Sequence, residues 1–173
     1  SKTFSDYLNK FNANQRKNIR KERKAIKDAG INISVLTNDE INNGIMQLMH
    51  NFYASHCARW GIWGSKYLSK EFFQELCLIE QKNQVVLFNA HREDPTNQLA
   101  MSLSIKDKNM LWGRYWGRNE EIKYLHFEVC YYTPISWALE QGISCFDPGA
   151  GGVHKRRRGF IAQSNISLHR WYD

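Results

Sequence analysis

Residues 84–118 read QVVLFNAHREDPTNQLAMSLSIKDKNMLWGRYWGR, and this stretch decides the fold class of the chain. Gln84–His91 is a nearly continuous apolar run, which is typical of a strand covered on both faces. Leu99–Ile105 alternates large apolar with small side chains, and Met110–Arg118 follows after one more turn. The turns at residues 94–97 and 106–109 are rich in Asp, Asn, Pro and Lys. Three strands joined by short turns predict an antiparallel meander.

Helices and two further strands are predicted on either side of this meander. The Thr37-x-x-Glu40 capping box predicts a helix start, and Pro134 predicts a kink or break near Tyr132–Thr133. The expected elements outside the meander are a strand over 31–36, helices over 37–58 and from residue 70, a helix over 124–141 and a strand over 143–146. This order predicts an α/β (α+β) protein with a mixed, largely antiparallel central sheet flanked by helices.

Positive charge is concentrated at the two ends of the chain. The net charge is +7, with +6 in residues 1–30, −3 in residues 31–153 and +4 in residues 154–173. Phe4–Ala29 is predicted to form one long basic helix, stopped by Gly30. A basic field attracts polyanions without identifying them. Candidate nucleic-acid-binding residues are therefore Arg16, Lys17, Arg20 and Lys24, and the alternative is a solvated charged helix.

Length and composition are those of one globular domain of 173 residues. There is no apolar run of about 18 residues, so no membrane span is expected, and the N-terminus has no signal-peptide apolar region. Because the chain starts at Ser1, we expect the native N-terminus to lie upstream. Four widely spaced cysteines among apolar neighbours predict buried, reduced thiols in a cytoplasmic protein, with no metal site.

Three unusual blocks lie in the second half of the chain. They are LWGRYWG at 111–117, LHFEVCYY at 125–132 and DPGAGGVHK at 147–155. Each block mixes aromatic with ionisable side chains, which are costly to bury unless they are paired. Polar groups converging among aromatics indicate a pocket rather than a plain core.

These blocks, together with Arg16–Arg23 near the start and Arg158-Gly159-Phe160 near the end, resemble the FemAB-like family of the GNAT superfamily. The resemblance implies the GNAT-like acyl-CoA N-acyltransferase fold over residues 31–173, preceded by the basic helix of residues 1–30. Because family members are about twice this long, it also implies that the chain is the C-terminal half of a two-lobed protein, with an N-terminal lobe as its partner. The chain departs from the family's pattern at Pro134, Asp147, Gly151 and Val153.

The implied reaction is transfer of an acyl or aminoacyl group to an amine of a peptide or peptidoglycan (cell-wall) precursor. Such a reaction requires a proton acceptor and a donor for the developing oxyanion. The candidate catalytic residues are Glu128, His154 and Lys155, and the candidate substrate-binding residues are Arg114, Tyr115, Trp116, His126, Asp147, Gly149 and Arg158. For Glu128 the alternative is a structural role at a helix start, for His126 a satisfied imidazole, and for residues 154–158 a solvated charge run.

The donor is not expected to be acetyl-CoA. The Gly-rich pyrophosphate loop of acetyl-CoA-dependent relatives is missing at residues 117–124, where two acidic residues, Glu120 and Glu121, would repel phosphate. An aminoacyl-tRNA or another acyl carrier is the expected donor, with no further cofactor. Two alternatives are a non-catalytic module that recognises a peptide or precursor, and a tRNA-binding module.

Overall fold

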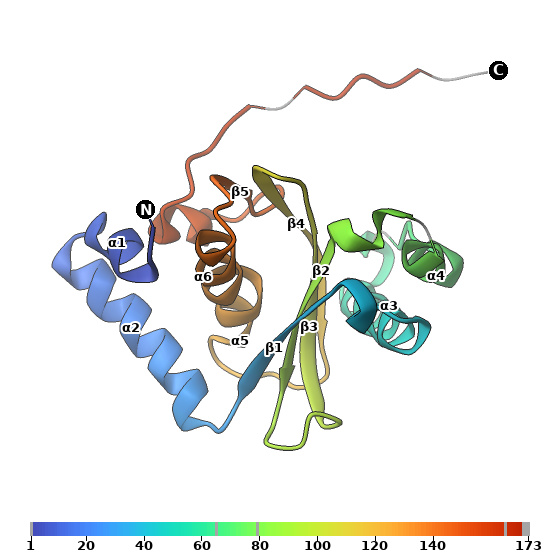
Figure 1. The fold of residues 1–173 in the computed structure, drawn as a ribbon, viewed down its shortest axis with the longest axis horizontal. Helices are drawn as coiled ribbons and strands as arrows, with labels where there is room; N and C mark the ends of the chain where they lie inside the picture. Colours follow the sequence, from blue (N-terminus) through green and yellow to red (C-terminus); the bar gives the residue numbers. More distant parts are fainter. Residues whose placement is uncertain (1, 65, 79, 165, 171–173) are drawn as a thin grey trace.

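The computed structural model describes residues 2–64, 66–78, 80–164 and 166–170, which contain one five-stranded sheet (Figure 1). Its order is β1–β2–β3–β4–β5, and neighbouring strands are antiparallel except for the parallel pair β4 and β5. The strands are β1 Asn32–Thr37, β2 Val85–His91, β3 Gln98–Lys106, β4 Met110–Arg118 and β5 Cys145–Asp147. The predicted meander and the mixed, largely antiparallel sheet are confirmed.

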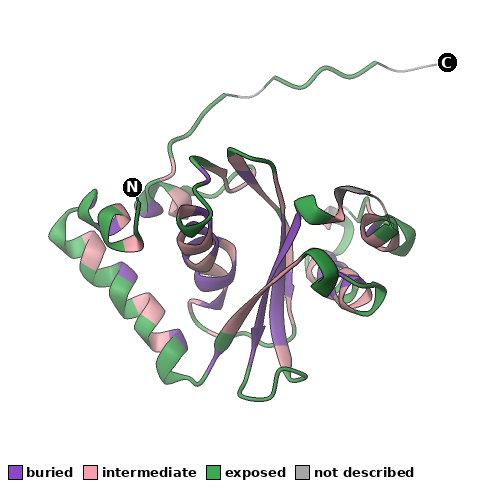
Figure 2. Cartoon of the chain, in the orientation of Figure 1, coloured by how far each residue is buried: buried purple, intermediate pink, exposed green. Residues whose placement is uncertain are grey.

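Helices cover both faces of the sheet (Figure 1). On one face, α3 (Asn43–Ala58) and α4 (Lys70–Leu78) pack on side chains that include Leu87 and Leu103. On the other face, Val86 and Phe88 pack with residues that follow β4. Every residue of β2 is buried, as Figure 2 shows, because successive side chains of one strand enter the two opposite layers.

The N-terminal segment forms two helices, so the prediction of one long helix was wrong. They are α1 (Phe4–Asn9) and α2 (Ala13–Asp28). Asn12 ends the continuity because its side chain accepts a hydrogen bond from the Gln15 amide and so caps α2. A similar correction applies further on: the Thr37 capping box begins only a 3-10 turn, η1 (Asn38–Glu40), and Asn42 caps α3.

The segment after β4 is helical but changes its winding twice. It runs as α5 (Leu125–Phe127), a π-helical turn η4 (Glu128–Tyr132) and α6 (Thr133–Glu140). Pro134 lies in the first turn of α6, where its missing N–H is tolerated. The chain stays helical through Tyr132–Thr133, where a kink or break was predicted, and changes there from π-helical to α-helical winding. The remaining short helices are η2 (Gly61–Trp63), η3 (Glu80–Gln84) and η5 (Val153–Arg158).

Gly117 allows the close packing of α3 against β4. A Cβ atom at this position would lie 2.0 Å from the main-chain oxygen of Phe52, and real Cβ atoms do not approach a backbone oxygen so closely. In the described residues no helix is long and apolar enough to cross a bilayer. Cys57 is buried as predicted, but Cys145 is exposed, so that prediction was wrong for Cys145.

Candidate functional site

A cavity of about 500 Å³ opens where β4 and β5 diverge. The two strands pair only from Met110↔Cys145 to Trp112↔Asp147, and β4 then continues to Arg118 paired with β3. We call this cavity the β4 cleft. Its lining consists of His56, Trp60, Ser102, Leu103, Ser104, Gly113, Arg114, Tyr115, Trp116, His126, Cys130, Tyr131, Pro148, Gly149, Ala150, Gly151, Gly152, His154 and Lys155. All three blocks identified in the sequence therefore contribute to one site.

A β-bulge shapes the wall of the cleft that β4 provides. Leu103 pairs with Tyr115 and Ser104 with Gly113, so Arg114 is the extra residue of the bulge. A bulge re-aims the side chains around it and interrupts the hydrogen-bond ladder. Arg114 Nη1 lies 3.6 Å from Asp147 Oδ2, and both side chains remain about 40% exposed.

Asp147 and Lys155 together hold the glycine-rich loop. The Asp147 carboxylate accepts a hydrogen bond from the Gly149 amide at 2.9 Å, and Asp147 itself is not part of the cleft lining. Lys155 Nζ donates to the carbonyl oxygens of Gly149 and Ala150, both at 2.9 Å. An ammonium group has three N–H donors, so one is available to a ligand in the cleft. Partial burial lowers the pKa of Lys155, and Asp147 and Cys130 oppose that shift.

Three histidines surround the cleft, and burial lowers the pKa of each. The ring of His126 lies 4.4 Å from Trp116 and 5.6 Å from His154, and Trp116 also contacts His56 at 5.3 Å.

The pKa of His126 falls to about 3 through burial and the neighbouring His154, His56, Arg158 and Lys155. Burial, and then the cations of Arg158 and Lys155, lower the pKa of His154. Burial, and then the cations of Arg59 and Arg118, lower the pKa of His56. The cleft therefore presents neutral imidazoles at pH 7.

The depressed pKa of His126 predicts a loss of stability in acid. Between pH 6.5 and about 3 the unfolded chain binds a proton that the folded chain does not, so the free energy of unfolding decreases as the pH falls. In His126→Gln, the change of the free energy of unfolding with pH should become smaller by up to about 1.4 kcal/mol per pH unit. Urea unfolding between pH 4 and 7 measures it, with the exposed His169→Gln as control. Equal slopes in the two variants would contradict the prediction.

The His154 ring makes a hydrogen bond to a second residue of the cleft. Its Nε2 lies 3.0 Å from the Tyr131 hydroxyl, which projects from the π-helical turn. Burial raises the pKa of Tyr131, so the phenol stays protonated at neutral pH. Sequence reasoning identified His154 but not Tyr131 as a site residue.

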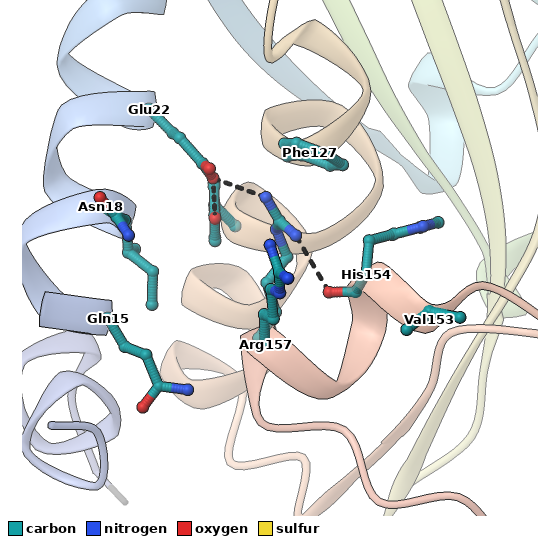
Figure 3. A pocket seen from close by; sticks show the side chains of 10 residues that line it. Gln15, Asn18, Glu22, Phe127, Val153, His154 and Arg157 are labelled. Carbon is teal, nitrogen blue, oxygen red and sulfur yellow. Dashed lines mark hydrogen bonds and ion pairs between the residues drawn. The ribbon is translucent and has the colours of Figure 1, made fainter.

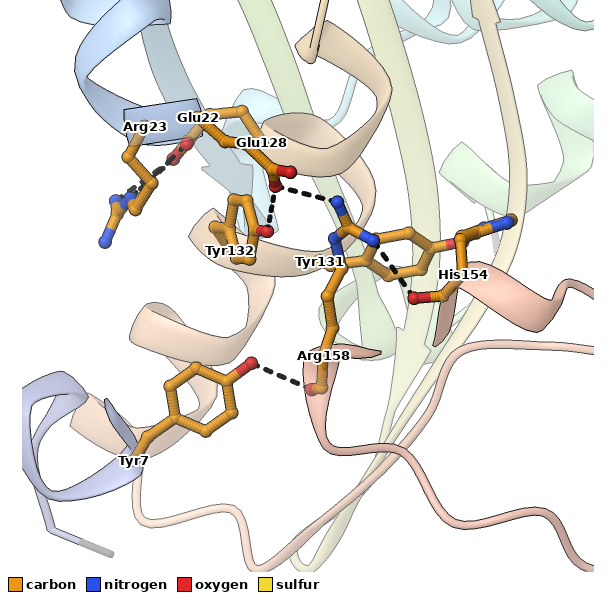
Figure 4. A network of polar contacts seen from close by, with 8 residues as sticks. All are labelled: Tyr7, Glu22, Arg23, Glu128, Tyr131, Tyr132, His154 and Arg158. Carbon is orange, nitrogen blue, oxygen red and sulfur yellow. Dashed lines mark hydrogen bonds and ion pairs between the residues drawn. The ribbon is translucent and has the colours of Figure 1, made fainter. Parts of the chain in front are cut away.

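Glu128 lies outside the cleft. Its carboxylate pairs with Arg23 Nη2 at 3.0 Å, accepts a hydrogen bond from the Thr133 hydroxyl at 2.9 Å, and is only 6% exposed (Figure 4). His126 and Glu128 are two residues apart on a helix and point in different directions, as expected. Glu128 therefore joins η4 to α2 through its ion pair with Arg23.

Arg158 also lies outside the cleft, in a buried network with α2. Its Nη2 is 2.7 Å from Glu22 Oε2 (Figure 4). Its guanidinium stacks 3.4 Å from the centre of the Phe127 ring. Tyr132 donates a hydrogen bond to the same Glu22 carboxylate. Neither Glu22 nor Tyr132 was predicted from the sequence.

The candidate nucleic-acid-binding cations on α2 differ in their surroundings. Lys17 and Arg20 are exposed, whereas the Arg16 guanidinium donates to the carbonyl oxygen of Phe11. Lys24 forms an exposed ion pair with Asp28 one turn later in the helix. Lys17 and Arg20 remain available to a polyanion.

His56 and Trp60 are cleft residues that the sequence reasoning missed. His56 lies in the last turn of α3, and Trp60 follows shortly after the helix ends at Ala58. The small polar residues Ser102 and Ser104 were a usable signal, since they alternate with large apolar side chains in the strand predicted over Leu99–Ile105.

Several solved structures share this architecture. An aminoglycoside acetyltransferase, meta-AAC0020, from an uncultured soil metagenomic sample in complex with sisomicin has 13% identity and a TM-score of 0.57, covering 84% of this chain and 97% of its own. A possible acetyltransferase of Clostridium difficile 630 has 11% identity and a TM-score of 0.54, covering 83% and 99%. A conserved protein of unknown function from Bacteroides thetaiotaomicron has 12% identity and a TM-score of 0.57, covering 88% and 51%. At these identities the likeness establishes the GNAT-like fold.

The sequence itself identifies the family. The chain belongs to the FemAB-like family, described as peptidoglycan biosynthesis/recognition, whose pattern it matches over residues 1–173. No curated protein matches it significantly.

Proposed function

We propose that this chain transfers an acyl or aminoacyl group to an amine of a peptide or peptidoglycan precursor in the β4 cleft. The observation that carries this proposal is the pairing of neutral His154 with Tyr131 beside the Lys155 ammonium group. Membership of the FemAB-like family supports the reaction class. A proton acceptor and a cation in one cleft are what attack of an amine on an ester requires.

The proposed proton path runs through Tyr131. The amine nitrogen attacks the carbonyl carbon of the donor ester, a C–N bond forms, and the carbonyl oxygen becomes an oxyanion near the remaining Lys155 N–H. Tyr131 passes its hydroxyl proton to His154 Nε2 and takes a proton from the attacking amine. The ester C–O bond then breaks, and the leaving oxygen receives a proton through the same two residues. No proton needs to leave the cleft during the cycle.

The surroundings of α5 support a donor other than acetyl-CoA. The amide groups of Leu125, Phe127 and Glu128 already donate to the carbonyl oxygens of Ile122 and Tyr124. A pyrophosphate bound at this helix start would have to compete with those contacts. We therefore propose a donor that is anchored elsewhere, as an aminoacyl-tRNA or another carrier would be. The exposed cations Lys17 and Arg20 supply attraction for such a polyanion.

A transfer assay tests the proposal. The chain would be incubated with a peptidoglycan-precursor peptide that carries an amine, together with aminoacyl-tRNA, an acyl carrier or acetyl-CoA, and amide products would be detected by mass spectrometry. The expected result is a product whose mass is increased by the acyl group, formed with a carrier-borne donor and not with acetyl-CoA. Peptide binding without a product from any donor would contradict transfer and favour a recognition module instead.

A further inference from the structure

A second cavity, of about 360 Å³, lies on the other side of η5 (Figure 3). We call it the α2 cavity. It lies between α2 and η5, and is lined by Gln15, Asn18, Ile19, Glu22, Phe127, Tyr132, Val153, His154, Arg157 and Arg158. His154 belongs to the lining of both cavities. Its carbonyl oxygen accepts from Arg158 Nη1 at 3.0 Å, while its ring contacts Tyr131 in the β4 cleft.

The polar lining of the α2 cavity has more hydrogen-bond donors than free acceptors. The Glu22 carboxylate is already engaged by Arg158 Nη2 and by the Tyr132 hydroxyl. Arg157 is exposed at the cavity wall. Arg158 is 5% exposed, and its Nε atom is buried with no hydrogen-bond partner among the described residues. Because the Glu22 carboxylate is already paired with Arg158, the exposed Arg157 guanidinium adds positive charge at the cavity wall, which is suited to an anionic oxygen.

The remaining residues of the cavity lining favour one class of anionic ligand over another. Asn18 presents a side-chain amide, which both donates and accepts hydrogen bonds as a peptide group does. The Gln15 amide also lines the cavity, although its oxygen already accepts from the Asn12 N–H at the start of α2. Ile19 and the Phe127 ring add apolar surface. A phosphate has no N–H groups for the amide oxygens, whereas a peptide with a terminal carboxylate satisfies amides and guanidinium together.

We propose that the α2 cavity binds the carboxylate-bearing end of a peptide. This inference rests on the proposed function, in which that peptide is the acceptor of the acyl group. Its carboxylate end would then bind in the α2 cavity and its reacting amine in the β4 cleft, with η5 between them. Binding energy gained away from the reacting atoms can then position the amine.

Calorimetric titration of the chain with dialanine, dialanine amide and inorganic phosphate tests the proposal. Dialanine is expected to bind at least roughly 10-fold more tightly than its amide, since a hydrogen bond to a charged group is lost in the amide. Arg157→Gln should weaken dialanine binding by a similar factor. The matched control is Arg156→Gln, which removes the same charge from a neighbouring exposed residue outside the cavity lining and should change binding less than about twofold.

Four outcomes would overturn the proposal: no detectable binding of dialanine, equal binding of its amide, equal effects of the two arginine variants, or tighter binding of phosphate than of dialanine. The result is also separable from the transfer assay. Dialanine binding that depends on Arg157, with no transfer from any donor, would contradict the proposed function and leave this inference intact. Transfer without Arg157-dependent binding would contradict this inference and leave the proposed function intact.

Discussion

His154→Gln is expected to lower the rate of acyl transfer by roughly 10²–10⁴-fold, the usual contribution of a positioned proton acceptor. The His154 imidazole, 3.0 Å from the Tyr131 hydroxyl, is the group that receives the proton in the proposed path. Glutamine keeps a polar side chain but cannot take up a proton near neutral pH. The measurement is the initial rate of amide formation under saturating acceptor.

A pH profile separates this role from a structural one. Because burial and nearby cations lower the pKa of His154, the wild-type rate should begin to fall only below pH 6.5 as His154 becomes protonated. The His154→Gln variant should lose that acidic limb. The exposed His169→Gln is the matched control and should keep both rate and profile. An unchanged rate in His154→Gln, in a protein that is still folded, would exclude His154 as the proton acceptor.

Arg158→Met is expected to destabilise the folded chain by about 3–5 kcal/mol, the usual cost of removing one partner of a buried ion pair. The Arg158 side chain is 6% exposed and the Glu22 side chain 16%, and their ion pair is 2.7 Å long. Without the guanidinium, the Glu22 carboxylate stays buried beside Tyr132 with no opposite charge. The stack on the Phe127 ring is lost as well. Urea unfolding measures the change in the free energy of unfolding.

Two further variants test the mechanism of this loss. The double variant Glu22→Gln/Arg158→Met should recover part of the stability, because it also removes the uncompensated charge. Lys24→Met breaks an ion pair on the same helix whose two side chains are 72% and 57% exposed. It should cost less than about 1 kcal/mol. Similar costs for Arg158→Met and Lys24→Met would show that the network does not stabilise the fold.

The parts of the fold that could be predicted from the sequence depend on local signals. The meander follows from alternation and turn residues, and Pro134 indicated an irregularity where the winding changes before α6. The break between α1 and α2 was missed because the Asn12 cap competes with residues that suit a continuous helix on either side. The glycine-rich loop and β4 were correctly placed in one pocket because both carry aromatic or cationic side chains in unusual density.

The parts of the site that could not be predicted depend on contacts between distant residues. Glu128 was a catalytic candidate, with a structural role at a helix start as the alternative. Its partner Arg23 is 105 residues away in the sequence. Arg158 similarly pairs with Glu22, 136 residues away. A single sequence shows which groups need a partner, but not which distant residue supplies it.

The contact between Gly117 and Phe52 also governs a property of the β4 cleft. Gly117 follows Trp116, and Phe52 lies one helical turn before His56, so the closest approach of β4 to α3 is beside the Trp116–His56 wall. Any side chain at position 117 would push the helix outward and separate the indole from the imidazole. Gly117 thus fixes the distance between two residues that line the cleft, although Gly117 is not itself part of the lining.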